Sequence, residues 1–243
     1  PADPGLRRAA ARRVSTNADT AGRMGPLQHY LLGTGSWFLS FGIQGVMFAW
    51  LVTMVLREAP ENVGFAQMAL LLPGTLLILV GGSYADRFGA RRVVVLAQTV
   101  AAAAPLLLVA ALVLGSLSFT LMLAYAVLIG TAQAFVTPAR DGLLNHVAGG
   151  RVQRTVMLTS IIQFGLQIVG FGVASLADLG GPVPILLVQS VVLGLGVVAF
   201  ARIRQEQSRA AGPAPALWRS VVEGGRTVLA SPAMRVIVVQ NVA

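Results

Sequence analysis

The feature that most constrains the fold of this chain is a succession of long apolar segments. A helix needs about 20 mostly apolar residues to cross the hydrocarbon core of a bilayer. Segments of about that length predict an all-α fold, a polytopic membrane protein built on a six-helix transmembrane bundle. Their approximate limits are 30–56, 65–82, 93–114, 119–138, 156–177 and 183–202.

The composition excludes a soluble domain. Hydrophobic residues make up 56% of the 243 residues and charged residues only 11%, against about 25% charged in a soluble domain. The net charge of +9 does not indicate nucleic-acid binding, because the basic residues fall in the gaps between apolar segments. No cysteine is present, which excludes disulfides and thiolate metal sites. We expect the lipid bilayer as a partner, and no nucleic acid.

The arginines predict which side of the membrane each connection faces. All eighteen basic residues are arginines, and Arg57 is the one that falls outside segments 1–29, 83–92, 139–155 and 203–232 with their adjoining helix ends. Basic connections stay in the cytoplasm. We therefore expect a multi-pass plasma-membrane protein with a cytoplasmic N-terminus, and the use of arginine alone favours a bacterial inner membrane.

The regions outside the bundle (residues 30–203) predict a tail, a linker and an incomplete helix. Residues 1–29 form a basic cytoplasmic tail, and residues 204–231 a cytoplasmic linker. The second part of the linker, LWRSVVEGGRTVLA, is amphipathic and is expected either to lie on the inner leaflet or to pack on protein. Residues 232–243 begin with a Ser-Pro helix start and predict a seventh transmembrane helix. Because twelve residues cannot span a bilayer, we expect the sequence to be a fragment that stops inside that helix.

A densely charged stretch, GGSYADRFGARR at 81–92, lies between the second and third apolar segments. Its arginines serve to fix the topology. Gly89 suits a tight turn, and Gly81 and Gly82 allow another helix to approach closely. Asp86 is costly at a membrane face unless it is paired. The available partners are Arg87, Arg91, Arg92 and the first turn of a facing helix.

This stretch resembles the loop between helices two and three of the major facilitator superfamily, whose pattern is roughly G-x-x-x-D-R-x-G-R-R. Ala90 intrudes into the pattern. The resemblance implies a gate, in which a charge cluster latches helix bundles together on the inner side and releases them when the transporter opens. The matching residues are Gly82, Asp86, Arg87, Gly89, Arg91 and Arg92.

A second stretch, at 135–160, is similar to the segment joining helices four and five in the bacterial drug and secretion exporters of that superfamily, the enterobactin-exporter-like proteins among them. Pro138 and Arg140 belong to the matching P-A-R-x-x-L-L-x-x-V pattern. The resemblance implies half of a 12-helix fold, with a missing C-terminal six-helix half as partner. It also implies efflux of small amphipathic substrates, drug or siderophore-like, by alternating access. The coupling source would be an ion gradient, as in a proton antiporter, with no bound cofactor.

Candidates for a substrate site are neutral, because no charged side chain falls in the middle of an apolar segment. A polar residue within the membrane is a functional candidate by default, although a lone glutamine there more often forms a helix–helix hydrogen bond. Helices one and four line the cavity in the superfamily that the chain resembles, which favours Gln44 and Gln133. The candidate set is Trp37, Ser40, Phe41, Gln44, Gln133, Gln163 and Gln167.

Two pairs of small residues, Gly130 with Ala134 and Gly170 with Ala174, predict packing seams between helices rather than sites.

Alternatives remain. The same fold could import its substrate, and the sequence could be a truncated, non-transporting fragment. Proton-coupled members often carry an arginine before the glycine that Gly130 matches, and exporters often have a proline where Phe171 stands; both are missing here. An intramembrane enzyme is not expected, because there is no G-x-S-x-G motif and no cluster of metal ligands. We therefore expect no catalytic residue and no metal.

Overall fold

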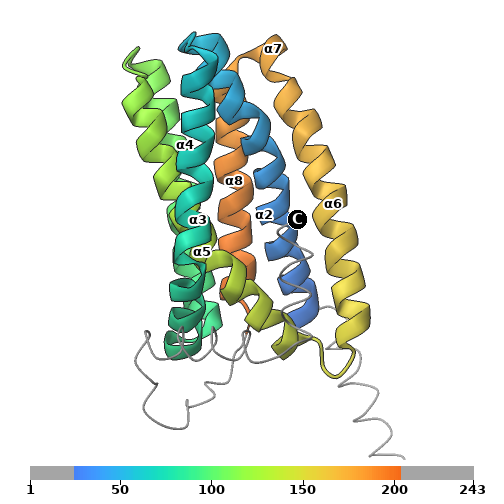
Figure 1. The fold of residues 1–243 in the computed structure, drawn as a ribbon. Coiled ribbons are helices and arrows are strands. Elements are labelled where there is room, and N and C mark those ends of the chain that lie inside the picture. Colours follow the sequence, from blue (N-terminus) through green and yellow to red (C-terminus); the bar gives the residue numbers. More distant parts are fainter. Residues whose placement is uncertain (1–24, 204–243) are drawn as a thin grey trace, which may run out of the picture.

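The computed structural model describes residues 25–203, which form a bundle of long helices (Figure 1). The π-helical turn η1 (Leu51–Val55) extends the first helix, and the short α7 (Ala177–Gly180) follows the fifth long one. The predicted linker, the predicted seventh helix and residues 1–24 of the tail lie outside the described residues. The long helices are α2 (Pro26–Trp50), α3 (Pro60–Phe88), α4 (Ala90–Val113), α5 (Phe119–Val147), α6 (Val152–Ser175) and α8 (Pro182–Ala201).

Within residues 25–203, six helices are long and apolar enough to cross a membrane, which confirms the all-α, polytopic fold class. Successive helices run in opposite directions, so the start of α2, the α3–α4 and α5–α6 links and the end of α8 lie together (Figure 1). We call this the arginine end, because among the described residues it carries every arginine except Arg57.

Two helices continue farther than the apolar segments predict. Helix α3 runs past residue 82 to Phe88, and α5 runs past residue 138 to Val147. The expected inner connection at 83–92 is therefore largely helical, and α3 and α4 are joined by Gly89 alone, with φ of 90°. A positive φ carries no steric penalty for glycine, so the predicted tight turn is confirmed. The helices outrun the apolar segments because a helix satisfies its own backbone hydrogen bonds wherever its side chains meet water.

The packing of the helices repeats. Helix α2 packs against α6 and α8, while α5 packs against α3 and α4, and α4 packs against α8. Each of these contacts has a counterpart if α2 is matched with α5, α3 with α6, and α4 with α8. Because α2 and α5 cross in opposite directions, the two three-helix units form an inverted repeat.

Glycines set the close approach of α2 and α6. A Cβ added at Gly42 would collide with the carbonyl oxygen of Gln167, and one added at Gly170 would collide with the carbonyl oxygen of Leu39. Each helix thus presents a glycine to the backbone of the other. Ala174, one turn farther along α6, is 1% exposed. The predicted packing seam at Gly170 is confirmed.

The seam between α3 and α5 has the same construction. A Cβ at Gly81 would collide with the carbonyl oxygen of Ala134, and a Cβ at Gly130 with that of Leu70. The predicted seam at Gly130 and the predicted close approach at Gly81 are both confirmed. The two seams occupy equivalent places in the inverted repeat, so a single packing rule positions four of the six helices.

Candidate substrate cavity and gating segment

Side chains from α2, α4, α5 and α8 surround a small cavity at the centre of the bundle. Its volume is about 10 Å³, which is close to the space that one water molecule occupies. Helix α2 contributes four neighbours, because a spacing of three and four residues places them on one helix face. The lining residues are Trp37, Ser40, Phe41, Gln44, Ala101, Ile129, Gln133 and Leu193.

Five of these lining residues belong to the set of candidates from the sequence. Trp37, Ser40 and Gln44 are buried, whereas Phe41 and Gln133 are partly exposed. The amides of Gln44 and Gln133 form no hydrogen bond with any described residue. An amide in such a place is free to bind a ligand, and no charged group lines the cavity.

Gln98 shows the role that a membrane glutamine more often has. It is 0% exposed, and its amide nitrogen donates to the carbonyl oxygen of Leu193 and to Ser36 Oγ, both at 3.1 Å. Gln98 therefore ties α4 to α8 and α2, which is a structural contribution. This contrast separates Gln44 and Gln133 from a glutamine that merely holds helices together.

The two glutamines of α6 do not line the central cavity. Gln163 and Gln167 are partly exposed, and the backbone of Gln167 faces Gly42 in the α2–α6 seam. The sequence indicates that Gln163 and Gln167 lie on a transmembrane helix. It does not indicate which face of that helix points into the bundle.

The candidate gating segment, residues 81–92, spans the end of α3, the Gly89 turn and the start of α4. Arg91 reaches across to the end of α8, where its guanidinium donates to the carbonyl oxygen of Ala201. That carbonyl is one of the last four of a helix and has no partner within it. Gly82 lies against Pro138, with a hypothetical Cβ 3.8 Å from the ring. The segment is thereby tied to α8 and packed on α5.

Asp86 lies on the outer surface of this segment. Its side chain is exposed, and it forms no ion pair or hydrogen bond with residues 25–203. The neighbouring Arg87 places its guanidinium carbon 5.4 Å from the centre of the Phe88 ring. Arg92 is exposed as well. The expected pairing of Asp86 with the nearby arginines is therefore not formed within the described part of the chain.

Arg140 lies buried near the arginine end of α5. Its side chain is 9% exposed, and its Nη2 is 3.3 Å from Oδ1 of the adjacent Asp141. The guanidinium also lies 4.7 Å from the centre of the Phe38 ring of α2, a distance at which a cation is attracted to an aromatic face. Pro138 lies within α5 without ending it. The sequence motif indicated Arg140, but nothing in the sequence indicated Phe38, which lies just over a hundred residues earlier.

A further contact escaped prediction at the opposite end of the bundle. Trp50 Nε1 donates to Asp178 Oδ1 at 2.8 Å, which joins the end of α2 to α7. A tryptophan and an aspartate at separate membrane edges give no sequence signal of pairing. Among residues 25–203, no group of three or more histidine or acidic side chains is placed to hold a metal ion.

Comparison with known proteins agrees with this architecture. The sequence profile of a major facilitator family, described as transmembrane secretion effector, matches residues 30–243. A search of curated proteins gives no match. The matched region includes all six spanning helices and both motifs. The chain therefore belongs to the transmembrane secretion effector family, whose members are multi-pass membrane transporters of the major facilitator type.

Proposed function

We propose that this protein exports small amphipathic molecules, drug-like or siderophore-like, by alternating access. The observation that carries the proposal is the central cavity, in which two glutamine amides without hydrogen-bond partners lie beside aromatic walls and no charge. Such a lining binds a neutral or amphipathic molecule through contact and a few hydrogen bonds. It would hold a strongly charged substrate poorly.

The size of the cavity requires that the protein change shape. A drug-sized ligand needs roughly 300 Å³ or more, far above the cavity's volume of about 10 Å³. Substrate therefore enters only when α2 and α5 present their cavity faces to a wider space. Rocking of this bundle against a second unit would supply that space.

The second unit in this proposal is another six-helix bundle, which would cover α3 and α6. In the most apolar stretch of α3 only 6% of the residues are buried, and in that of α6 only 11%, compared with 39–50% in the other four. These two helices are also matched in the inverted repeat, so their exposed faces occupy equivalent positions. A partner that packs on both would sit above the central cavity.

Asp86 is the proposed latch between the two units. Its exposed carboxylate has no partner in the described bundle, and it lies on α3, one of the two helices that the second unit would cover. The free N–H groups at the start of a facing helix are suited to bind it. With the arginine end in the cytoplasm of a bacterial cell, a proton gradient would drive release of the latch and export.

Accumulation assays in an exporter-deficient bacterium test the proposal. Cells expressing the full-length protein should accumulate less of at least one dye or siderophore in a panel, and an uncoupler should abolish the difference. Gln44→Leu and Gln133→Leu should each lose most of that efflux. Gln67→Leu is the matched control, because Gln67 is a partly exposed glutamine of α3 outside the cavity. Equal accumulation with and without the protein, across the whole panel, would count against export.

The latch has its own test. Asp86→Asn should reach the membrane in normal amount and lose transport, because the amide cannot bind an arginine or a helix start as an anion does. Glu61→Gln is the control, since Glu61 is an exposed acid at the opposite end of α3. Normal transport by Asp86→Asn would show that this carboxylate is no latch.

A further inference from the structure

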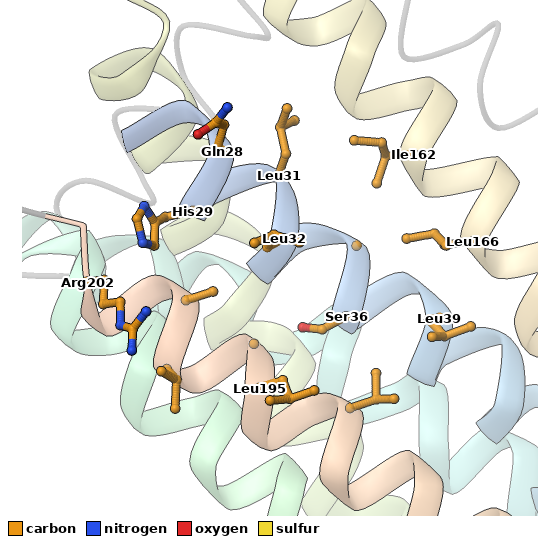
Figure 2. Close-up of a pocket in the computed structure, with 15 residues that line it drawn as sticks. Gln28, His29, Leu31, Leu32, Ser36, Leu39, Ile162, Leu166, Leu195 and Arg202 are labelled. Atoms are coloured by element: carbon orange, nitrogen blue, oxygen red, sulfur yellow. The ribbon is translucent and has the colours of Figure 1, made fainter. Parts of the chain in front are cut away.

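A large groove lies between α6 and α8. Both helices pack against α2 but hardly against each other, and the space between them has a volume of about 850 Å³. Its walls are apolar side chains, with Ile162 and Leu166 from α6 facing Leu195 from α8 (Figure 2). Leu32 and Leu195 are 51% and 65% exposed. The groove therefore opens on the outside of the bundle, where a spanning protein meets lipid.

The groove becomes polar at the arginine end. His29 and Arg202 lie together there, on the first turn of α2 and just past the end of α8, with Gln28 beside them (Figure 2). His29 Nδ1 lies 3.1 Å from the carbonyl oxygen of Gly25. Since a carbonyl only accepts, Nδ1 carries the proton, and Nε2 of the neutral ring is an acceptor rather than a donor.

Gln28 is oriented in a similar way. The backbone N–H of Gly25 donates to Gln28 Oε1 at 2.9 Å, so the amide nitrogen of Gln28 is left as a donor. Arg202 is exposed and adds a full positive charge. The start of α2 adds the positive end of a helix dipole. The polar end of the groove is thus built for an anion, while the rest of it is built for a hydrocarbon chain.

We propose that this groove binds an anionic phospholipid from the leaflet at the arginine end. One acyl chain would lie along the apolar walls between α6 and α8, and the phosphate would accept from Arg202 and from the amide nitrogen of Gln28. Anionic lipids are attracted to basic groups at the membrane surface by about 1 kcal/mol for each arginine, or about fivefold in affinity. The proposal does not depend on the direction of transport or on the substrate.

Charge complementarity favours this occupant over the chain's own linker. Residues 204–231 follow directly after the groove and contain four arginines but only two glutamates. A net basic segment would bring further positive charge to Arg202, whereas a phosphate would neutralise it. The segment's entry into the groove is therefore one of the outcomes that the test must detect.

Lipid retention by the purified full-length protein tests the proposal. Native mass spectrometry would follow the binding of phosphatidylglycerol and of zwitterionic phosphatidylcholine, titrated into detergent. Arg202→Gln should weaken phosphatidylglycerol binding about fivefold and leave phosphatidylcholine unchanged. Arg92→Gln removes an arginine from the same end of the bundle, but outside the groove, and should retain phosphatidylglycerol like the unsubstituted protein. Equal effects of the two substitutions would overturn the assignment of the phosphate site.

A groove-filling substitution tests the acyl-chain site. Leu195→Trp should reduce binding of both lipids, because it occupies the space for the chain whatever the head group. Val191→Trp is the matched control on α8, where residue 191 is 63% exposed but does not line the groove. Phosphatidylglycerol with a photoactivatable acyl chain should label peptides of α2, α6 and α8, the helices that line the groove. Labelling confined to α3, α4 and α5 would overturn the proposal, as would exclusion of the lipid by residues 204–231 seated in the groove.

Discussion

The α3–α4 pair and the α6–α8 pair hold equivalent places in the inverted repeat, but they close differently. Helices α3 and α4 contact each other far less than the packed pairs do, but they are held together at one end by the single-residue connection at Gly89. Helices α6 and α8 are separated by α7 and hardly touch, which leaves the groove of about 850 Å³. The glycine seams are alike on both sides. The inverted repeat therefore fixes how α2 crosses α6 and how α5 crosses α3. The contact between α3 and α4 and that between α6 and α8 can still differ.

The two sides differ in structure as well. Where α3 and α4 meet, the Gly89 turn lies in the charged stretch 81–92, which is bound to α8 through Arg91. Where α6 and α8 part, the bundle keeps a space that faces lipid. Three sets of substitutions test how far the equivalence of the two sides extends.

The largest expected effect is at the seams. Gly170→Ala and Gly130→Ala each place a methyl group against a backbone carbonyl, and overpacking of this kind costs about 1–3 kcal/mol of unfolding free energy. Reversible unfolding in mixed micelles measures it. Gly172→Ala is the control, because no atom lies within 4 Å of the added Cβ; it should be neutral or stabilising by up to about 1 kcal/mol. A loss of unfolding free energy for only one of the two substitutions would show that the two glycine seams are not equivalent.

A smaller effect, with opposite signs, is expected for the buried glutamines of α4 and α8. Gln98→Leu removes two hydrogen bonds and should lower the unfolding free energy by about 0.6–2 kcal/mol. The Gln189 side chain is buried near the Tyr125 hydroxyl, but neither of its polar atoms reaches hydrogen-bond geometry with a partner in the described bundle. Gln189→Leu should therefore raise the unfolding free energy by about 1 kcal/mol. Destabilisation by both would show that the two positions are equivalent.

The smallest effect is expected at the hydrogen bond between Trp50 and Asp178, which lies at the end of the bundle opposite the arginine end. Trp50→Phe removes the 2.8 Å hydrogen bond to Asp178 and should cost about 0.5–1 kcal/mol, because the pair is exposed. Asp178→Asn keeps an oxygen acceptor and should cost less. If Asp178→Asn proves as costly as Trp50→Phe, the charge of Asp178 rather than the hydrogen bond would hold α7 in place.

Hydropathy and small-residue spacing predicted the bundle, because both report local requirements. Each apolar segment marked a spanning helix, and Gly130 and Gly170 marked the seams through their small-residue pairs. The C-terminal ends of α3 and α5 could not be located from hydropathy. Hydropathy falls where the hydrocarbon ends, whereas a helix continues until its backbone finds another arrangement, as at Gly89.

The central cavity was partly predictable for a related reason. Trp37, Ser40, Phe41 and Gln44 recur every three or four residues, so a single face of α2 brings them together. Gln163 and Gln167 have the same spacing on α6, but which face of α6 meets the bundle depends on packing with α2. The groove could not be predicted, because an apolar residue that faces lipid and one that lines a groove look alike in a sequence.

The bond between Arg91 and the last carbonyl-bearing turn of α8 has a mechanical consequence. The chain leaves the described bundle two residues later, after Ile203. Because this bond links the last residue of α8 to the first turn of α4, a force on the chain after Ile203 would act on Arg91 as well as on α8. Movement of the segment that follows would therefore also displace the Gly89 turn, where α3 and α4 are joined.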